Sequence, residues 1–134
     1  MNAVGAPQVP WFTTGCGGWL YALNSLFVQV DEGGTRLLPA VPSAIPNAAF
    51  SNLRAEQGVL VSGAFEEGRL VRLTARAPYP LVWRFRIPRS YVGHAASERN
   101  PTNGQNGFWV AFETALGLEE TDLLQIIQIA CARL

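Results

Sequence analysis

The sequence predicts an α+β fold, namely an antiparallel β-sandwich-like domain flanked by an N-terminal and a C-terminal helix. The first observation is size, because 134 residues with 49% hydrophobic and 15% charged side chains suffice for one folded core but not for two. The second is a central series of short apolar runs separated by glycine and proline turns, and the third is helical spacing near both ends. The chain is therefore expected to form a single domain over residues 1–134.

An N-terminal helix is expected over residues 17–30. Its apolar side chains recur at helical spacing and would form one stripe, made of Trp19, Leu23, Leu26, Phe27 and Val30. The Asp-Glu-Gly-Gly segment at 31–34 is expected to end this helix, because glycine commonly follows a helix C-cap.

A β-rich body is expected over residues 35–115. Residues 35–38 form a short apolar run, and the prolines that follow exclude a central strand there. Residues 59–65 and 69–75 are two apolar runs joined by a short turn that contains Gly68, a pattern typical of a β-hairpin.

Residues 81–87 give the clearest strand pattern. Leu81, Trp83 and Phe85 would face the core, whereas Val82, Arg84 and Arg86 would face the solvent. Strand character returns at 108–114, after a long polar connection over 88–106.

A C-terminal helix is expected over residues 119–133. Acidic residues at its start suit the positive end of the helix dipole. Leu124 and Ile129 lie off its main apolar stripe, so this helix is either well buried or meets a partner.

Composition and motifs exclude several classes of function. Ten arginines balance ten acidic residues without a basic stripe, so neither nucleic acid nor an anionic membrane surface is an expected partner. No apolar run is long enough to span a membrane, and no secretory signal is seen, so a cytoplasmic location is expected if the chain is full-length. Cys16, Cys131 and His94 do not form a metal-binding pattern, and no cofactor motif is present. A disulfide between the two cysteines is left open.

The succession of segments between Gly18 and Ile87 is distinctive. A predicted helix ending in Leu-Phe-Val-Gln at 26–29 is followed by Arg-Leu-Leu-Pro-Ala-Val-Pro at 36–42, then by Ser-Asn-Leu-Arg-Ala-Glu at 51–56 and by the hairpin. This order resembles the C-terminal part of family 95 glycoside hydrolases, the α-L-fucosidase type. There the last helix of an (α/α)6 barrel leads through a Leu-Leu-Pro-Ala-Leu-Pro segment into a C-terminal β-domain.

The resemblance covers residues 17–88 and, more weakly, 107–117. The connection at 88–106 and the helix at 119–133 depart from the family pattern. The family's acid and base residues lie in the helical barrel, upstream of the matching region, so none is carried onto this chain. The resemblance therefore implies a non-catalytic accessory module related to carbohydrate-active enzymes.

The carboxylates do not form a convincing catalytic pair. Hydrolysis of a glycosidic bond needs two carboxyl groups that face each other across it. The adjacent pairs at 66–67 and 119–120 fall in a turn and at a helix start, and Glu113 falls on the wet face of a strand. A small enzyme that uses Cys16, which precedes a helix, or His94 is the alternative reading.

Carbohydrate binding needs aromatic faces beside polar groups. Trp109 or Tyr91 could form a shallow platform near Arg84 and Arg86, with packing into the core as the alternative for the rings. The apolar helices also predict a homo-oligomer, and a self-associating protein without a sugar ligand is the competing interpretation.

Overall fold

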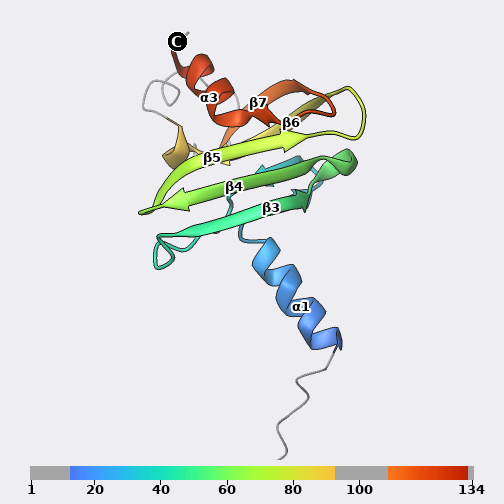
Figure 1. Ribbon diagram of the computed structural model, residues 1–134, viewed down its shortest axis with the longest axis vertical. Coiled ribbons are helices and arrows are strands. Elements are labelled where there is room, and N and C mark those ends of the chain that lie inside the picture. Colours follow the sequence, from blue (N-terminus) through green and yellow to red (C-terminus); the bar gives the residue numbers. More distant parts are fainter. Residues whose placement is uncertain (1–12, 93–108, 133–134) are drawn as a thin grey trace, which may run out of the picture.

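The structure, a computed structural model, describes residues 13–92 and 109–132. The described chain forms two four-stranded sheets that face each other, with one helix before them and one after them (Figure 1). In chain order the elements are α1 (Thr13–Asn24), β1 (Val28–Asp31), β2 (Gly34–Leu37), β3 (Ala48–Arg54), the 3-10 turn η1 (Glu56–Gly58), β4 (Leu60–Glu66), β5 (Arg69–Arg76), β6 (Leu81–Pro88), the 3-10 turn η2 (Arg89–Tyr91), β7 (Trp109–Leu116), β8 (Thr121–Asp122) and α3 (Leu123–Ala132).

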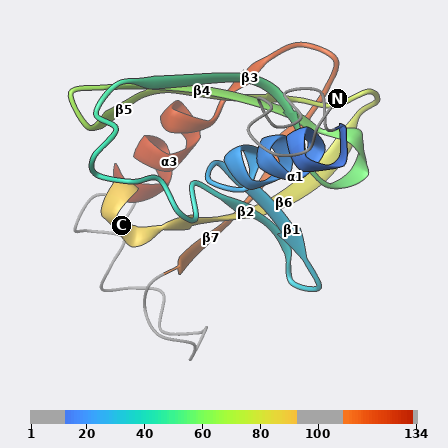
Figure 2. The same cartoon turned by 90° about the horizontal axis from the view of Figure 1, so that it is seen from below.

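The two sheets make the sandwich that the sequence predicts. Sheet A has the order β1-β2-β6-β7 and sheet B the order β3-β4-β5-β8. All pairs are antiparallel except β2 and β6, which run parallel. The exclusion of a central strand at 35–38 was wrong, because β2 pairs with both β1 and β6 and ends before the first proline at 39. Seen from below, the strands of the two sheets form separate layers, and α3 lies between them at one side (Figure 2). The predicted fold class is therefore confirmed.

The hydrophobic core fills the space between the two sheets. Both sheets and α3 contribute side chains with almost no solvent exposure, among them Leu37, Val59, Val61, Leu73, Trp83, Phe85, Ile87 and Leu123. On β6 the inward residues Trp83, Phe85 and Ile87 alternate with the outward residues Val82, Arg84 and Arg86. The alternation predicted for this strand is confirmed.

The N-terminal helix is shorter than the sequence predicts. It ends at Asn24, and residues 28–31 form strand β1, which pairs with β2 as a hairpin. Phe27 leaves the helix to stack on Phe50 of β3, with ring centroids 4.7 Å apart. The predicted helix over 17–30 thus begins earlier, at Thr13, and is wrong beyond Asn24, because Phe27 and Val28 pack into the sandwich. The glycines at 33–34 make a hairpin turn instead of a helix cap.

The hairpin of β4 and β5 follows its prediction. Glu66 pairs with Arg69, and the two residues between them have positive φ angles, 50° at Glu67 and 76° at Gly68. A two-residue turn with both φ angles positive matches the twist of the flanking strands.

The C-terminal helix begins four residues later than predicted. Thr121 and Asp122 form the short strand β8 against β5. Helix α3 starts at Leu123, where the backbone N–H of Gln125 donates to the carboxylate of Asp122 at 3.2 Å. Leu123 and Ile127 are buried, so the face of α3 that bears them packs against the sandwich and does not cover α1.

Candidate functional site

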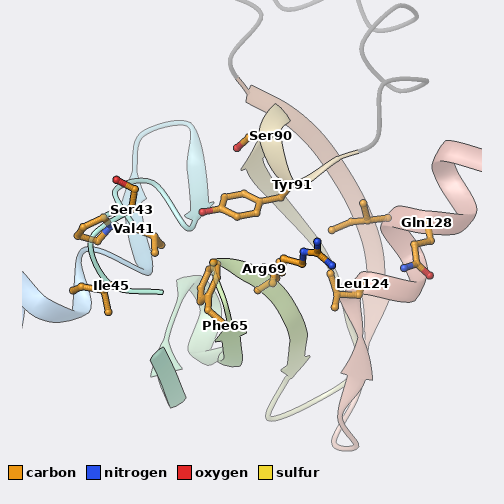
Figure 3. A pocket seen from close by; sticks show the side chains of 13 residues that line it. Val41, Ser43, Ile45, Phe65, Arg69, Ser90, Tyr91, Leu124 and Gln128 are labelled. Carbon is orange, nitrogen blue, oxygen red and sulfur yellow. The ribbon is translucent and has the colours of Figure 1, made fainter. Parts of the chain in front are cut away.

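A cleft of about 880 Å³ opens where one end of the sandwich meets α3. Four segments that are distant in the sequence line it, namely the connection after β2, the β4–β5 hairpin, η2 and α3. Figure 3 shows the side chains from these segments pointing toward a common space. The volume lies within the range of about 300–1,000 Å³ that is common for small-molecule sites.

The connection between β2 and β3 forms one wall of the cleft through Val41, Ser43 and Ile45. Leu38 anchors its start, because this side chain is buried and its N–H donates to the carbonyl of Phe27. The end of the connection, at Pro46 and Asn47, is bound to the β4–β5 turn by two hydrogen bonds. Buried leucine at the start and bonded backbone at the end together hold this irregular, proline-containing wall in place.

Asn47 and Pro46 make these two hydrogen bonds. The side-chain oxygen of Asn47 accepts from the N–H of Glu67 at 3.0 Å, and the carbonyl of Pro46 accepts from the N–H of Gly68 at 2.8 Å. Besides joining β4 to β5, the hairpin turn thus holds the wall of the cleft in position through these two hydrogen bonds.

Tyr91 is the aromatic residue in the middle of the cleft. Its ring packs edge-on against Phe65, with centroids 5.9 Å apart and an interplanar angle of 64°. Its hydroxyl points across the cleft toward the wall that carries Val41 and Ser43 (Figure 3). Burial raises the pKa of the Tyr91 hydroxyl above its ordinary value, so this group remains a protonated donor at neutral pH.

Polar groups are spaced around the largely apolar lining. They are the hydroxyls of Ser43, Ser90 and Tyr91, the amide of Gln128 and the guanidinium of Arg69. None of these side-chain groups makes a hydrogen bond or an ion pair within the described chain, so each is available to a ligand. No carboxylate is present among the described lining residues. The cleft can therefore recognise a molecule, but its described lining lacks the carboxyl pair of a glycoside hydrolase.

The outer face of sheet A carries another, smaller hollow of about 340 Å³, lined in part by Arg84, Arg86 and Glu113. Here the charged groups bind one another. Arg84 pairs with Glu113 at 2.6 Å, and Arg86 pairs with Asp31 at 2.8 Å. A ligand at this hollow would have to compete with ion pairs that already exist.

Asp31 is the centre of this charged face. It pairs with both Arg36 and Arg86, and it accepts a hydrogen bond from the N–H of Gly33 at 2.8 Å. Burial by itself would raise the pKa of the Asp31 carboxyl, but the Gly33 hydrogen bond and the two guanidinium groups lower this pKa below its ordinary value. Arg36 also lies over the ring of Trp109, 5.4 Å from its centroid.

The structure divides the four residues that the sequence suggested for sugar binding. Arg84, Arg86 and Trp109 belong to the outer face of sheet A, whereas Tyr91 lies in the cleft against Phe65 of sheet B. The reason is local, since β6 ends at Pro88 and the turn η2 redirects the chain to the inner side of sheet A. A platform that joins Tyr91 to the arginines is therefore not formed, whereas Trp109, the other ring suggested for it, shares the outer face of sheet A with Arg84 and Arg86.

The remaining candidates lie apart from the cleft. Cys16 is exposed on α1. Glu113 lies on the solvent-exposed face of β7, as expected. The acidic pairs at 66–67 and 119–120 are exposed. His94 and the side chain of Cys131 lie outside the described residues, so the acid–base role and the disulfide stay untested.

The cleft residues Ser43, Phe65, Arg69 and Gln128 were not among the residues predicted from the sequence. They come from three separate segments, and only the fold brings them together. The sequence contains one signal for the cleft. Leu124 is an apolar residue off the main apolar stripe of the C-terminal helix, and it lines the cleft.

Within the described residues, no helix is long and apolar enough to cross a membrane, and no three potential metal ligands cluster together. Comparison with known proteins adds no assignment, because no family model, curated protein or solved structure matches this chain.

Proposed function

We propose that this chain is a non-catalytic accessory domain, related to those of carbohydrate-active enzymes, that binds a carbohydrate in the cleft between the sandwich and α3. The observation that carries the proposal is the combination of the Tyr91 ring with unpaired polar groups around an apolar lining. Sugars present apolar ring faces and hydroxyl edges, and a site of this composition offers contacts to both. The sequence resemblance to family 95 glycoside hydrolases supports the same class of ligand.

A glycan array that includes L-fucose-containing oligosaccharides would find the ligand, and calorimetric titration would measure its affinity. Tyr91→Phe removes only the hydroxyl and keeps the ring contact with Phe65. Loss of one hydrogen bond is expected to weaken binding about threefold to tenfold.

Tyr79→Phe is the matched control, because Tyr79 is more than half exposed and does not line the cleft. This variant should bind as the unmodified chain does. An array without any binding, or an equal loss in both variants, would contradict carbohydrate binding in the cleft.

A second proposal concerns α1, which extends away from both sheets (Figure 1). Every residue from Gly15 to Asn24 is exposed, including Trp19 and Leu20. An isolated helix of this length is marginal in water, and each internal glycine costs about 1 kcal/mol relative to alanine. With glycines at 15, 17 and 18, α1 needs a supporting surface to remain helical.

We propose that this surface is α1 of a second copy of the chain. Cys16, Trp19, Leu20 and Leu23 follow the spacing i, i+3, i+4 and i+7, so they lie on one face of the helix. The helix carries no charged side chain. Two copies could therefore pair these faces without charge repulsion, as in an isologous dimer.

Light scattering after size-exclusion chromatography would measure the molar mass. The unmodified chain is expected to be a dimer and Leu20→Glu a monomer, because the new charge would be buried in the helix pair. Val82→Glu is the control, since Val82 on sheet A is as exposed as Leu20, at 62% and 59% respectively. A monomeric unmodified chain would contradict the proposal.

A further inference from the structure

The cleft contains one charged side chain among its described lining, Arg69 at the start of β5. Its guanidinium extends across the cleft toward α3, where Leu124 and Gln128 lie (Figure 3). Arg36, Arg84 and Arg86 of the outer face each bind a carboxylate, whereas Arg69 forms no ion pair within the described chain. Arg69 is thus the charged residue of the described lining, and it has no ion-pair partner within the described chain.

We infer that the ligand of the cleft carries a carboxylate, which pairs with Arg69 at the α3 side while the rest of the molecule packs against Tyr91 and the apolar lining. This inference rests on the proposed function and names its ligand class, because among saccharides it selects those that contain a uronic acid. A guanidinium binds a carboxylate through two parallel hydrogen bonds. This geometry sets the orientation of the ligand, and the positive charge selects for a negatively charged group.

The acidic residues of the neighbouring turn, Glu66 and Glu67, do not pair with Arg69 within the described chain. Glu66 is its register partner across the hairpin turn, yet the two side chains do not form an ion pair. Glu66 and Glu67 are exposed and do not line the cleft. They reduce the local positive potential without occupying the guanidinium, so Glu66→Gln should strengthen the binding of an acidic ligand about twofold.

The same carboxylate chemistry could come from an acidic saccharide or from an amphipathic organic acid. The test therefore titrates the intact chain with three probes, which are a glucuronate-containing disaccharide, its neutral glucose counterpart and decanoate. Each titration is repeated with Arg69→Gln and with Arg72→Gln, an equal change of charge on the same strand at a residue that is exposed, as Arg69 is, but lies outside the cleft.

The expected result is that the acidic disaccharide binds more tightly than the neutral one. Arg69→Gln should weaken the binding of the acidic disaccharide about fivefold to tenfold and change that of the neutral one less than about twofold. Arg72→Gln should bind both disaccharides with nearly the affinity of the unmodified chain.

Equal affinity for both disaccharides would overturn the carboxylate inference and leave carbohydrate binding standing. Binding of decanoate alone, with dependence on Arg69, would support the carboxylate and overturn the carbohydrate proposal. Failure of all three probes would overturn both.

Discussion

Asp31 shows how one side chain can stabilise a sheet edge. It accepts a hydrogen bond from the N–H of Gly33 inside the β1–β2 turn, and it binds Arg36 of β2 and Arg86 of β6. A single carboxylate therefore connects the turn to two strands. About two thirds of the Asp31 side chain is shielded from solvent, so screening reduces these interactions without abolishing them.

Asp31→Asn is expected to lower the free energy of unfolding at pH 7 by about 1 kcal/mol, because the ion pairs are lost while the turn hydrogen bond can persist. The pKa of Asp31 is lower in the folded state than in the unfolded state. The stabilisation is therefore full above the unfolded-state pKa of about 4 and is lost as the pH falls through the folded-state pKa. Urea unfolding would measure the free energy of unfolding of both proteins at pH 7 and at about pH 3. The difference between the variant and the unmodified chain should be smaller at about pH 3.

Glu113→Gln provides the comparison for this measurement. The Arg84–Glu113 pair is also short, but both side chains are more than half exposed. Its loss is expected to change stability by less than about 0.5 kcal/mol at pH 7. A larger loss of unfolding free energy for Glu113→Gln than for Asp31→Asn would show that the ion pairs of Asp31 are not the main electrostatic contribution of this face to stability.

At the level of elements, the period-two pattern of β6 was sufficient to predict that strand, whereas β1 (Val28–Asp31) and β3 (Ala48–Arg54) were not predicted as strands. Alternation in residues 81–87 places Trp83 in the core and Val82 in solvent, as the structure shows. The β4–β5 hairpin was also predictable, because Gly68 supplies one of the two positive φ angles that its turn requires. Local sequence decides such elements, because the alternation of side chains and the geometry of the turn depend on neighbouring residues.

The helix boundaries were less predictable for a physical reason. Apolar residues at 26–30 continue the helical spacing of α1, yet pairing with β2 and the stacking of Phe27 on Phe50 outweigh that spacing. The same competition makes residues 121–122 a strand against β5. The Phe27–Phe50 stacking and the β5–β8 pairing join residues far apart in the chain, so a local pattern does not contain them. The cleft could not be predicted for the same reason.

Helix α3 completes the core through Leu123, which is fully buried between the sheets. Leu123→Ala is expected to lower the free energy of unfolding by about 2–5 kcal/mol, because it leaves a cavity at a site closed on all sides. Ile129→Ala on the same helix removes an exposed side chain and should change stability by less than about 0.5 kcal/mol. Urea unfolding followed by circular dichroism would measure both. Similar values for the two variants would mean that α3 does not seal the sandwich.

At the level of the whole molecule, the chain divides into a packed body and one exposed helix. The body buries residues from both sheets and α3 in a continuous cluster, whereas α1 is exposed along residues 15–24. A domain of this size is expected to unfold cooperatively, but elements with few buried contacts can open alone at much lower free energy. Amide hydrogen exchange can resolve these two behaviours within one molecule.

We expect the amides of β4, β5, β6 and β7 that are hydrogen-bonded between strands to exchange only through global unfolding and to be insensitive to protein concentration. The amides of α1 should be almost unprotected in dilute solution, where the chain is monomeric, and should gain protection as concentration rises and α1 pairs between two copies. Leu20→Glu should abolish the gain and leave the strand amides unchanged. If α1 were strongly protected at every concentration in both proteins, its support would come from within the chain, and pairing between copies would be excluded as its cause.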